Sequence, residues 1–299
     1  MKMTVSFGRM AAALLIGTGL FLASCSKNND EKTIVSAEQV AMTTASAESE
    51  AEGEIIFDDV FNNVMGVNAT VGIGGTGEFQ ANQSDQPGTL QSTCFTLNFD
   101  FLAAPDTFPL KVTIDFGTTG CTGRDGRIRM GKIITVYTGP LIRPGSVAET
   151  SFEGYSVNGI KVEGQHRVEN KSTSTQFTFE TKVTNGKLTR PNGNTWTWNR
   201  TRTITQTDGW GTPWLASDDV FTIVGNGSGT VTIGDRTGTW TSTNVEPLVK
   251  RFNCRWIVKG KQAIQRNDGP EGIIDFGTGD CDNKATLTVN GVSREITLK

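Results

Sequence analysis

The feature that most constrains this chain is an internal duplication. Residues 114–118 (Ile-Asp-Phe-Gly-Thr) recur as residues 274–278, a shift of 160 positions. Four cysteines share that shift and form two equally spaced pairs, Cys94 with Cys121 and Cys254 with Cys281. Because the Asp-Phe-Gly stands at the same place inside each pair, the chain is expected to build one local structure twice.

The duplication also predicts how the cysteines pair. Four cysteines allow three pairings, and only Cys94–Cys121 with Cys254–Cys281 respects the repeat. The midpoint of the second pair falls in residues 267–269 (Asn-Asp-Gly), a strong turn signal, and that of the first falls in a longer loop at 104–109. We therefore expect each pair to face itself across a hairpin, at positions that bring Cα atoms to about 4.5 Å. The alternative is four buried free thiols.

The chain between the repeats is typical of strands and tight turns. The full sequence contains 35 glycines, and Asn-Gly pairs at 158–159 and 185–186 are signals for type I′ turns. Turn signals recur at short intervals with no helical crossover between them. The sequence thus predicts a mainly β fold over residues 67–299, an antiparallel meander in the form of a sandwich or an elongated twisted sheet. Its two related halves are at about 90–170 and 250–299.

The N-terminus has the three parts of an export signal. Lys2 and Arg9 supply positive charge, residues 11–23 are almost wholly apolar, and residues 22–25 read Leu-Ala-Ser-Cys. The last four resemble the bacterial lipobox, which implies a signal peptide over 1–24 and a lipid on Cys25. Since Ser26 rather than Asp follows, we expect a membrane anchor in the outer membrane. The alternative is an ordinary signal peptide with an incidental cysteine.

A polar tether and a short helix are expected next. Residues 25–52 contain no aromatic residue and read as a flexible spacer. Their polar and acidic start resembles a signal for display on the cell surface. From 53 to 66, apolar residues recur at helical spacing and predict a short amphipathic helix that docks on the sheet. Its two faces are Ile56, Phe57, Val60, Phe61 and Val64, and opposite them Asp58, Asp59, Asn62 and Asn63.

One strand, at 195–205, offers a candidate binding surface. Alternation places Trp196, Trp198, Arg200 and Arg202 on one face and threonines on the other. If that face is exposed, indoles beside guanidinium groups form a platform for a sugar ring or an acidic glycan. The second interpretation is that the tryptophans are buried under neighbouring structure with the arginines at the rim.

Several chemistries have no support in the sequence. Loss of Lys2 and Arg9 with the signal would lower the net charge from −3 to −5, which argues against a nucleic-acid partner. His166 is the single histidine and lies in an alternating segment, where we expect it on the surface. There is no nucleophile elbow and no cluster of zinc ligands, so we expect no cofactor, no metal and no catalysis. Acidic pairs that converge only in space remain open.

Residues 114–117 and 121–127, followed by 131–139 and 155–164, resemble a recurrent pattern in uncharacterised lipoproteins of Bacteroidetes-type bacteria. The resemblance covers about residues 50–299 and implies an envelope lipoprotein, without implying an activity.

Three hypotheses about function follow from the sequence. The first is a non-catalytic module, lipid-anchored in the outer membrane or on the cell surface, that binds a glycan or a protein. The second is a structural or assembly role in the envelope, and the third is a hydrolase that uses acidic residues.

Overall fold

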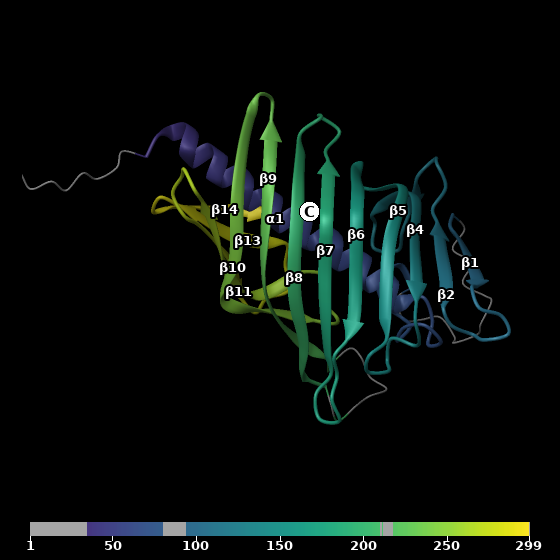
Figure 1. Cartoon of the computed structure of the whole chain (residues 1–299). Helices are drawn as coiled ribbons and strands as arrows, with labels where there is room; N and C mark the ends of the chain where they lie inside the picture. The colour runs from purple at the N-terminus through teal and green to yellow at the C-terminus, as the bar shows by residue number, and fades with distance from the viewer. Residues whose placement is uncertain (1–34, 80–93, 210, 212–217, 299) are drawn as a thin grey trace, which may run out of the picture. The chain divides into compact units, whose positions relative to one another are not determined.

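The computed structural model describes residues 35–79, 94–209, 211 and 218–298. In that part of the chain, one long helix lies against a single antiparallel sheet (Figure 1). The mainly β prediction is confirmed. The strands form one twisted sheet rather than the two packed sheets of a sandwich.

The elements follow one another in a simple order. The helices are α1 (Ala37–Gly66) and η1 (Gly77–Phe79). The described strands are β1 (Thr96–Phe101), β2 (Leu110–Asp115), β3 (Cys121–Thr122), β4 (Ile128–Tyr137), β5 (Val147–Val157), β6 (Ile160–Asn170), β7 (Thr178–Thr189), β8 (Thr195–Asp208), β9 (Val220–Ile233), β10 (Arg236–Arg251), β11 (Ile257–Arg266), β12 (Gly272–Thr278), β13 (Lys284–Val289) and β14 (Val292–Thr297). Apart from β3, which pairs with β4, each strand pairs with its neighbours in the chain. The sheet is therefore a meander, as expected.

Helix α1 begins earlier than the sequence predicts. Ser36 and Gln39 form a capping box, in which each side chain bonds the other residue's backbone N–H. Alanine, glutamate and glutamine, which favour helices, follow that cap. Residues 37–52 are therefore helical, and the prediction of a flexible tether over 25–52 and a helix confined to 53–66 is wrong in this part. Residues 25–34 lie outside the described residues.

The sheet surrounds much of α1. Residues 53–60 are all buried, and eight consecutive helical positions point in every direction around the axis. In Figure 1 the helix runs behind the strands, and it contacts strands from β8 to β13. On another side, the Tyr137 hydroxyl of β4 donates to the Val64 carbonyl at 2.8 Å. The polar helix face with Asp58 and Asp59 was expected to meet solvent, but both are buried because the curled sheet covers it.

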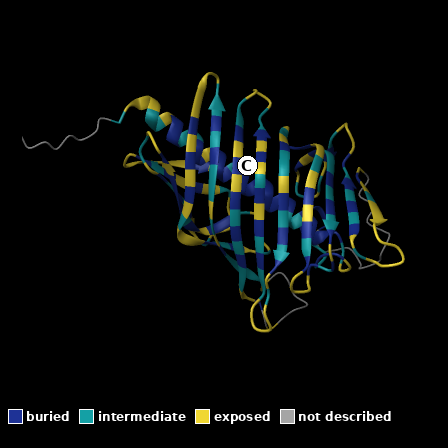
Figure 2. Cartoon of the chain, in the orientation of Figure 1, coloured by how far each residue is buried: buried dark blue, intermediate teal, exposed yellow. Residues whose placement is uncertain are grey.

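The alternation of buried and exposed residues follows the strands in Figure 2. Inward positions of β7 and β8 are buried while their neighbours face water, the pattern of a sheet with one covered face. None of the described helices combines the length and the apolar character needed to cross a membrane.

A single carboxylate, that of Glu50, joins α1 to three strands. It is fully buried. Its Oε2 accepts the indole N–H of Trp198 at 2.7 Å and that of Trp240 at 2.9 Å. Its Oε1 accepts from Arg200 at 2.9 Å, Ser242 at 2.7 Å and Gln262 at 2.8 Å. Five donors from β8, β10 and β11 thus satisfy one buried charge, which holds the sheet against the helix.

Two glycines make room for the indoles that bond Glu50. A Cβ on Gly53 of α1 would lie 3.2 Å from the Trp198 ring, and one on Gly229 of β9 would lie 2.3 Å from the Trp240 ring. The second separation is below any real carbon contact. Glycine at these positions therefore lets two large side chains reach the helix.

The predicted disulfides are present. Cys94 is bonded to Cys121 with a Cα separation of 5.2 Å, and Cys254 to Cys281 with 5.7 Å. The hairpins β1–β2 and β11–β12 also turn where expected. The cysteines are not ladder partners within these hairpins, however, because Cys94 and Cys254 precede β1 and β11. Each bond instead closes the open end of its hairpin.

The two Asn-Gly pairs behave differently. Asn158-Gly159 forms the tight turn between β5 and β6, with positive φ at both residues. Asn185-Gly186 was expected to be a second turn, but it lies inside β7, where the pairing with β8 shifts register. Asn185 has a φ of 52° and donates its backbone N–H to Asn199 Oδ1 at 2.9 Å. The same dipeptide signal thus marks a β-bulge here, since some bulges, like type I′ turns, place a residue in the left-handed region.

The buried Glu50 network predicts a large effect of a small change. Glu50→Gln keeps the side-chain shape but removes the charge that Arg200 and the other donors face. We expect the free energy of unfolding to fall by about 3–5 kcal/mol, as when one partner of a buried pair is lost. Urea unfolding of the parent and variant measures it.

Glu48→Gln on the same helix is the matched control. Glu48 pairs with Arg294 at 2.7 Å, but both side chains are about half exposed. Its loss should cost less than about 1 kcal/mol. Equal unfolding midpoints for the two variants would contradict the role given to Glu50.

Candidate functional site: a half-apolar, half-charged cavity

The four residues of the predicted binding platform lie inside the protein. Trp196 and Trp198 are 0% exposed, and Arg200 and Arg202 are 3% and 2% exposed. They face α1, so the second interpretation, burial beneath other structure, describes the tryptophans. Because the arginines are buried too, these residues do not form the exposed surface that the glycan hypothesis requires.

The arginines are buried because α1 carries a matching row of acids. Glu50, Glu54 and Asp58 recur every four residues and thus share one side of the helix. Arg200 Nε lies 2.8 Å from Glu54, and Arg202 Nη1 lies 2.6 Å from it. The platform residues therefore position the helix rather than a ligand.

A cavity of about 480 Å³ opens where this row ends. One wall is apolar and comes from α1, the residues around β7, and β8 and β9. Its side chains are Phe61, Met65, Ile73, Phe177, Phe179, Ile204, Phe221, Ile223 and Phe252. Edge-to-face aromatic contacts stabilise it, with ring centroids 5.9 Å apart for Phe61 and Phe179 and 4.7 Å apart for Phe177 and Phe179.

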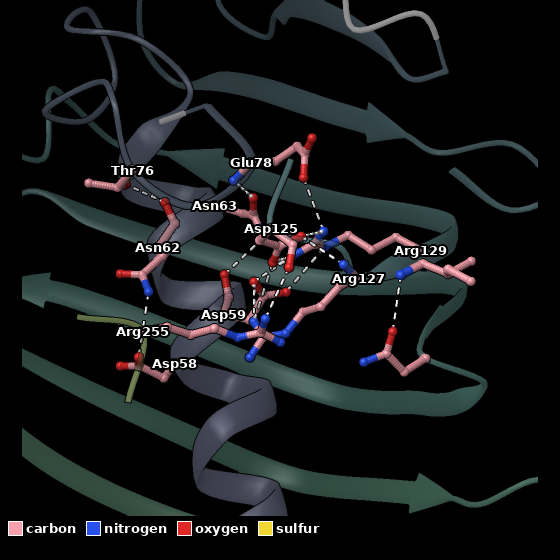
Figure 3. A network of polar contacts seen from close by, with 12 residues as sticks. Asp58, Asp59, Asn62, Asn63, Thr76, Glu78, Asp125, Arg127, Arg129 and Arg255 are labelled. Carbon is pink, nitrogen blue, oxygen red and sulfur yellow. Dashed lines mark hydrogen bonds and ion pairs between the residues drawn. The ribbon is translucent and has the colours of Figure 1, made fainter. Parts of the chain in front are cut away.

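The rest of the lining includes a cluster of paired acids and bases (Figure 3). Asp59 of α1 lies 2.7 Å from both Arg127 and Arg129. Arg129 is fully buried and also contacts Asp125 at 2.7 Å and Glu78 at 3.0 Å. These bases come from the turn before β4 and from β4 itself, so the first repeat supplies one side of the cavity.

The second repeat supplies the other side. Lys250 at the end of β10 lies 3.0 Å from Asp58, and its Nζ also donates to the Arg255 carbonyl at 2.6 Å. Arg255 Nη1 donates to the backbone carbonyl of Asp125 at 3.0 Å. That contact joins segments separated by the whole run of strands from β4 to β10, and it brings the two repeats together at the cavity.

The ion pairs control the protonation of the carboxylates. Burial by itself would raise the pKa of Asp58, but the charges of Lys250 and Arg202 outweigh it and hold that pKa below its usual value. Burial is likewise outweighed at Asp125, where bonds from Arg129 lower the pKa to about 2. At Glu78 burial prevails and the pKa is raised. The carboxylates of Asp58 and Asp125, which line the cavity, are therefore ionised and paired at neutral pH.

Sequence reasoning missed this site for a definable reason. The sequence placed Asp58 and Asp59 on the polar face of a short helix, opposite its apolar face, and Arg127 in a turn. The spacing of Glu50, Glu54 and Asp58 by four residues was the available signal, because a row of acids that becomes buried needs a row of bases. Among the described residues, no group of three or more His, Cys, Asp or Glu side chains is placed to hold a metal ion.

The single histidine is also in the core. His166 is 0% exposed, against the expectation that it lies on the surface, because its side of β6 faces α1. Its ring packs 5.9 Å from that of Phe57, and within the described structure neither ring nitrogen has a hydrogen-bond partner. Burial and the nearby charge of Arg202 lower its pKa to about 3. His166 does not line the cavity.

The neutral, buried His166 predicts a pH dependence of stability. Its pKa in the folded protein, about 3, lies below the value of 6.5 of a free histidine. The unfolded chain therefore binds a proton first, and stability is lost as the pH falls from about 6.5 toward 3. In His166→Leu, which has nothing to protonate there, the loss between pH 6.5 and 4.5 should be smaller. Urea unfolding across that range measures the difference, and parallel profiles for the two proteins would contradict it.

Comparisons with protein families, curated proteins and solved structures find no match for this chain. The cavity and its charges therefore carry the functional argument by themselves.

Proposed function

We propose that this protein is a non-catalytic binding module, lipid-anchored at the bacterial outer membrane, and that it holds a small amphipathic ligand in the cavity. The observation that carries the proposal is a cavity of about 480 Å³ whose lining combines phenylalanine side chains with paired acids and bases. Ligand sites are of this size and are lined mainly by apolar groups with a few polar ones that orient the ligand. The apolar and the charged side chains would take the apolar and polar parts of one molecule.

Binding is better supported than hydrolysis by acidic residues. A general acid needs a raised pKa and access to the substrate. Asp58 and Asp125 line the cavity, but their pKa values are lowered by the bases beside them. Glu78 has a raised pKa, but its side chain is 1% exposed and faces Arg129. None of these three carboxylates around the cavity meets both requirements.

The position of the aromatic residues also argues for a cavity ligand rather than a glycan. The indoles of Trp196 and Trp198, which a sugar could stack on, are 0% exposed. Phe61 and Phe221, by contrast, are only partly buried and line the open cavity. An apolar chain or ring fits such a wall better than a polyhydroxylated sugar does.

The membrane anchor is proposed from the sequence, since residues 1–34 lie outside the described residues. The basic start, the apolar run at 11–23 and the cysteine at 25 support it. Attachment at Cys25 would leave residues 26–36 as a link to the start of α1. The cavity would then be held close to a membrane that contains amphipathic molecules.

The anchor makes a direct prediction. Cys25→Ala removes the thiol that would receive the lipid, so the protein should leave the membrane fraction or remain uncleaved. Detergent partition of cell fractions, with mass analysis of the N-terminal peptide, measures both. Ser24→Ala, which keeps the lipobox pattern, is the control and should stay anchored. Unchanged acylation of Cys25→Ala would refute the proposal.

The cavity makes a second prediction. The neutral dye N-phenyl-1-naphthylamine becomes fluorescent in apolar sites and should bind the parent protein at one saturable site. Phe221→Ser removes part of the apolar wall and should weaken binding about tenfold, the effect of roughly 1.4 kcal/mol of lost apolar contact.

Phe99→Ser is the matched control for the dye experiment. Phe99 lies on β1, is 39% exposed and does not line the cavity, so its loss should leave dye binding unchanged. Thermal unfolding must show that all three proteins are folded. Absence of saturable binding by the folded parent would instead favour the structural role in the envelope.

A further inference from the structure

We propose that the ligand is a single-chain amphiphile with an anionic head, and that Arg255 holds that head at the rim of the cavity. This inference rests on the proposed function and specifies the class of molecule bound. It follows from the charges of the lining residues, from the way Arg255 is held, and from the apolar side chains that line the same cavity.

Among the described residues, Arg255 is the one base of the cavity lining with no carboxylate within ion-pair distance. Arg127 lies 2.7 Å from Asp59, and Lys250 lies 3.0 Å from Asp58. The Asp125 carboxylate accepts from Arg129 at 2.7 Å. The Arg255 guanidinium instead donates a hydrogen bond to a backbone carbonyl, that of Asp125. An anion beside Arg255 would supply the charged partner that this guanidinium lacks.

Arg255 is presented in a fixed position. The disulfide Cys254–Cys281 ties down the residue before it, and Lys250 Nζ bonds its carbonyl at 2.6 Å. The guanidinium lies 4.7 Å from the Trp256 ring centre, over its face. A guanidinium has five N–H donors, and the bond to Asp125 uses one of them. The side chain is exposed and can therefore offer its other donors to a ligand.

The surroundings of Arg255 disfavour its charged form. Burial and the positive charges of Arg127 and Arg129 lower the pKa of Arg255, although Asp125 and Asp59 act in the opposite direction. A negative group that binds beside several cations reduces the electrostatic repulsion between them. A carboxylate or phosphate accepts paired N–H donors from arginine, which matches this group.

The apolar wall specifies the rest of the ligand. Phe252 lies three residues before Arg255, so the wall begins beside the proposed head site. Phe221 is the register partner of Lys250, Ile223 follows two residues along β9, and Phe61 on α1 also lines the cavity. An alkyl or acyl chain that starts at the guanidinium could follow this wall without burying a polar group. Fatty acids and alkyl phosphates share this chemistry.

Displacement of N-phenyl-1-naphthylamine from the full chain tests the head group. Dodecanoate, dodecyl phosphate, dodecanol and dodecyltrimethylammonium are compared below their micelle concentrations. The anionic compounds should compete at least tenfold more tightly than dodecanol, and the cation should compete least. A preference between carboxylate and phosphate identifies the head that the site favours, and either one supports an anionic ligand.

Arg255→Gln should weaken dodecanoate about tenfold while leaving dye and dodecanol affinities unchanged, since only the anion loses its partner. Arg251→Gln is the matched control, because Arg251 is exposed nearby, carries the same charge and does not line the cavity. If the dye binds but dodecanoate and dodecanol compete equally, or if both variants act alike, the anion site is refuted. If the dye does not bind, the cavity proposal itself fails.

Discussion

The structure depends on a charged helix held inside a curled sheet. Glu50 shows how this is possible, because five donors from β8, β10 and β11 satisfy its carboxylate. A buried charge without such partners would oppose folding by several kcal/mol. The sheet can therefore enclose α1 only when its strands are in the register that brings these donors together. The bonds to Glu50 thus fix how the sheet curves around α1.

The pairing of helix acids with strand bases continues along α1 as far as the cavity. Glu54 pairs with Arg200 and Arg202, and Asp58 pairs with Lys250. Beyond these pairs the lining side chains are apolar. They are Phe61 on the helix and Phe179 and Phe221 on the strands. A half-apolar, half-charged space remains where the pairing stops. The cavity is thus a consequence of the way in which the sheet closes around α1.

A segment from each half of the duplication contributes to the cavity. The turn after Cys121 delivers Asp125 and Arg127, and the residue after Cys254 is Arg255. Both segments follow a disulfide cysteine, and they meet at the cavity through the bond from Arg255 to the Asp125 carbonyl. The two disulfides therefore fix the parts of the chain that form the charged rim.

The sequence by itself determined the strands, most of the turns and the pairing of the cysteines. These features depend on local patterns: alternation along a strand, Asn-Gly pairs, and a repeat that excludes two of three disulfide pairings. It could also have shown the start of α1 through the Ser36 and Gln39 cap. Only the tertiary structure decided which polar residues are buried, as Trp198, Arg200 and Asp58 demonstrate. The reason is physical, because a charge can be buried only beside its partner. Glu50 and Arg200 are 150 residues apart in the chain, so no local pattern joins them until the sheet has curled around the helix.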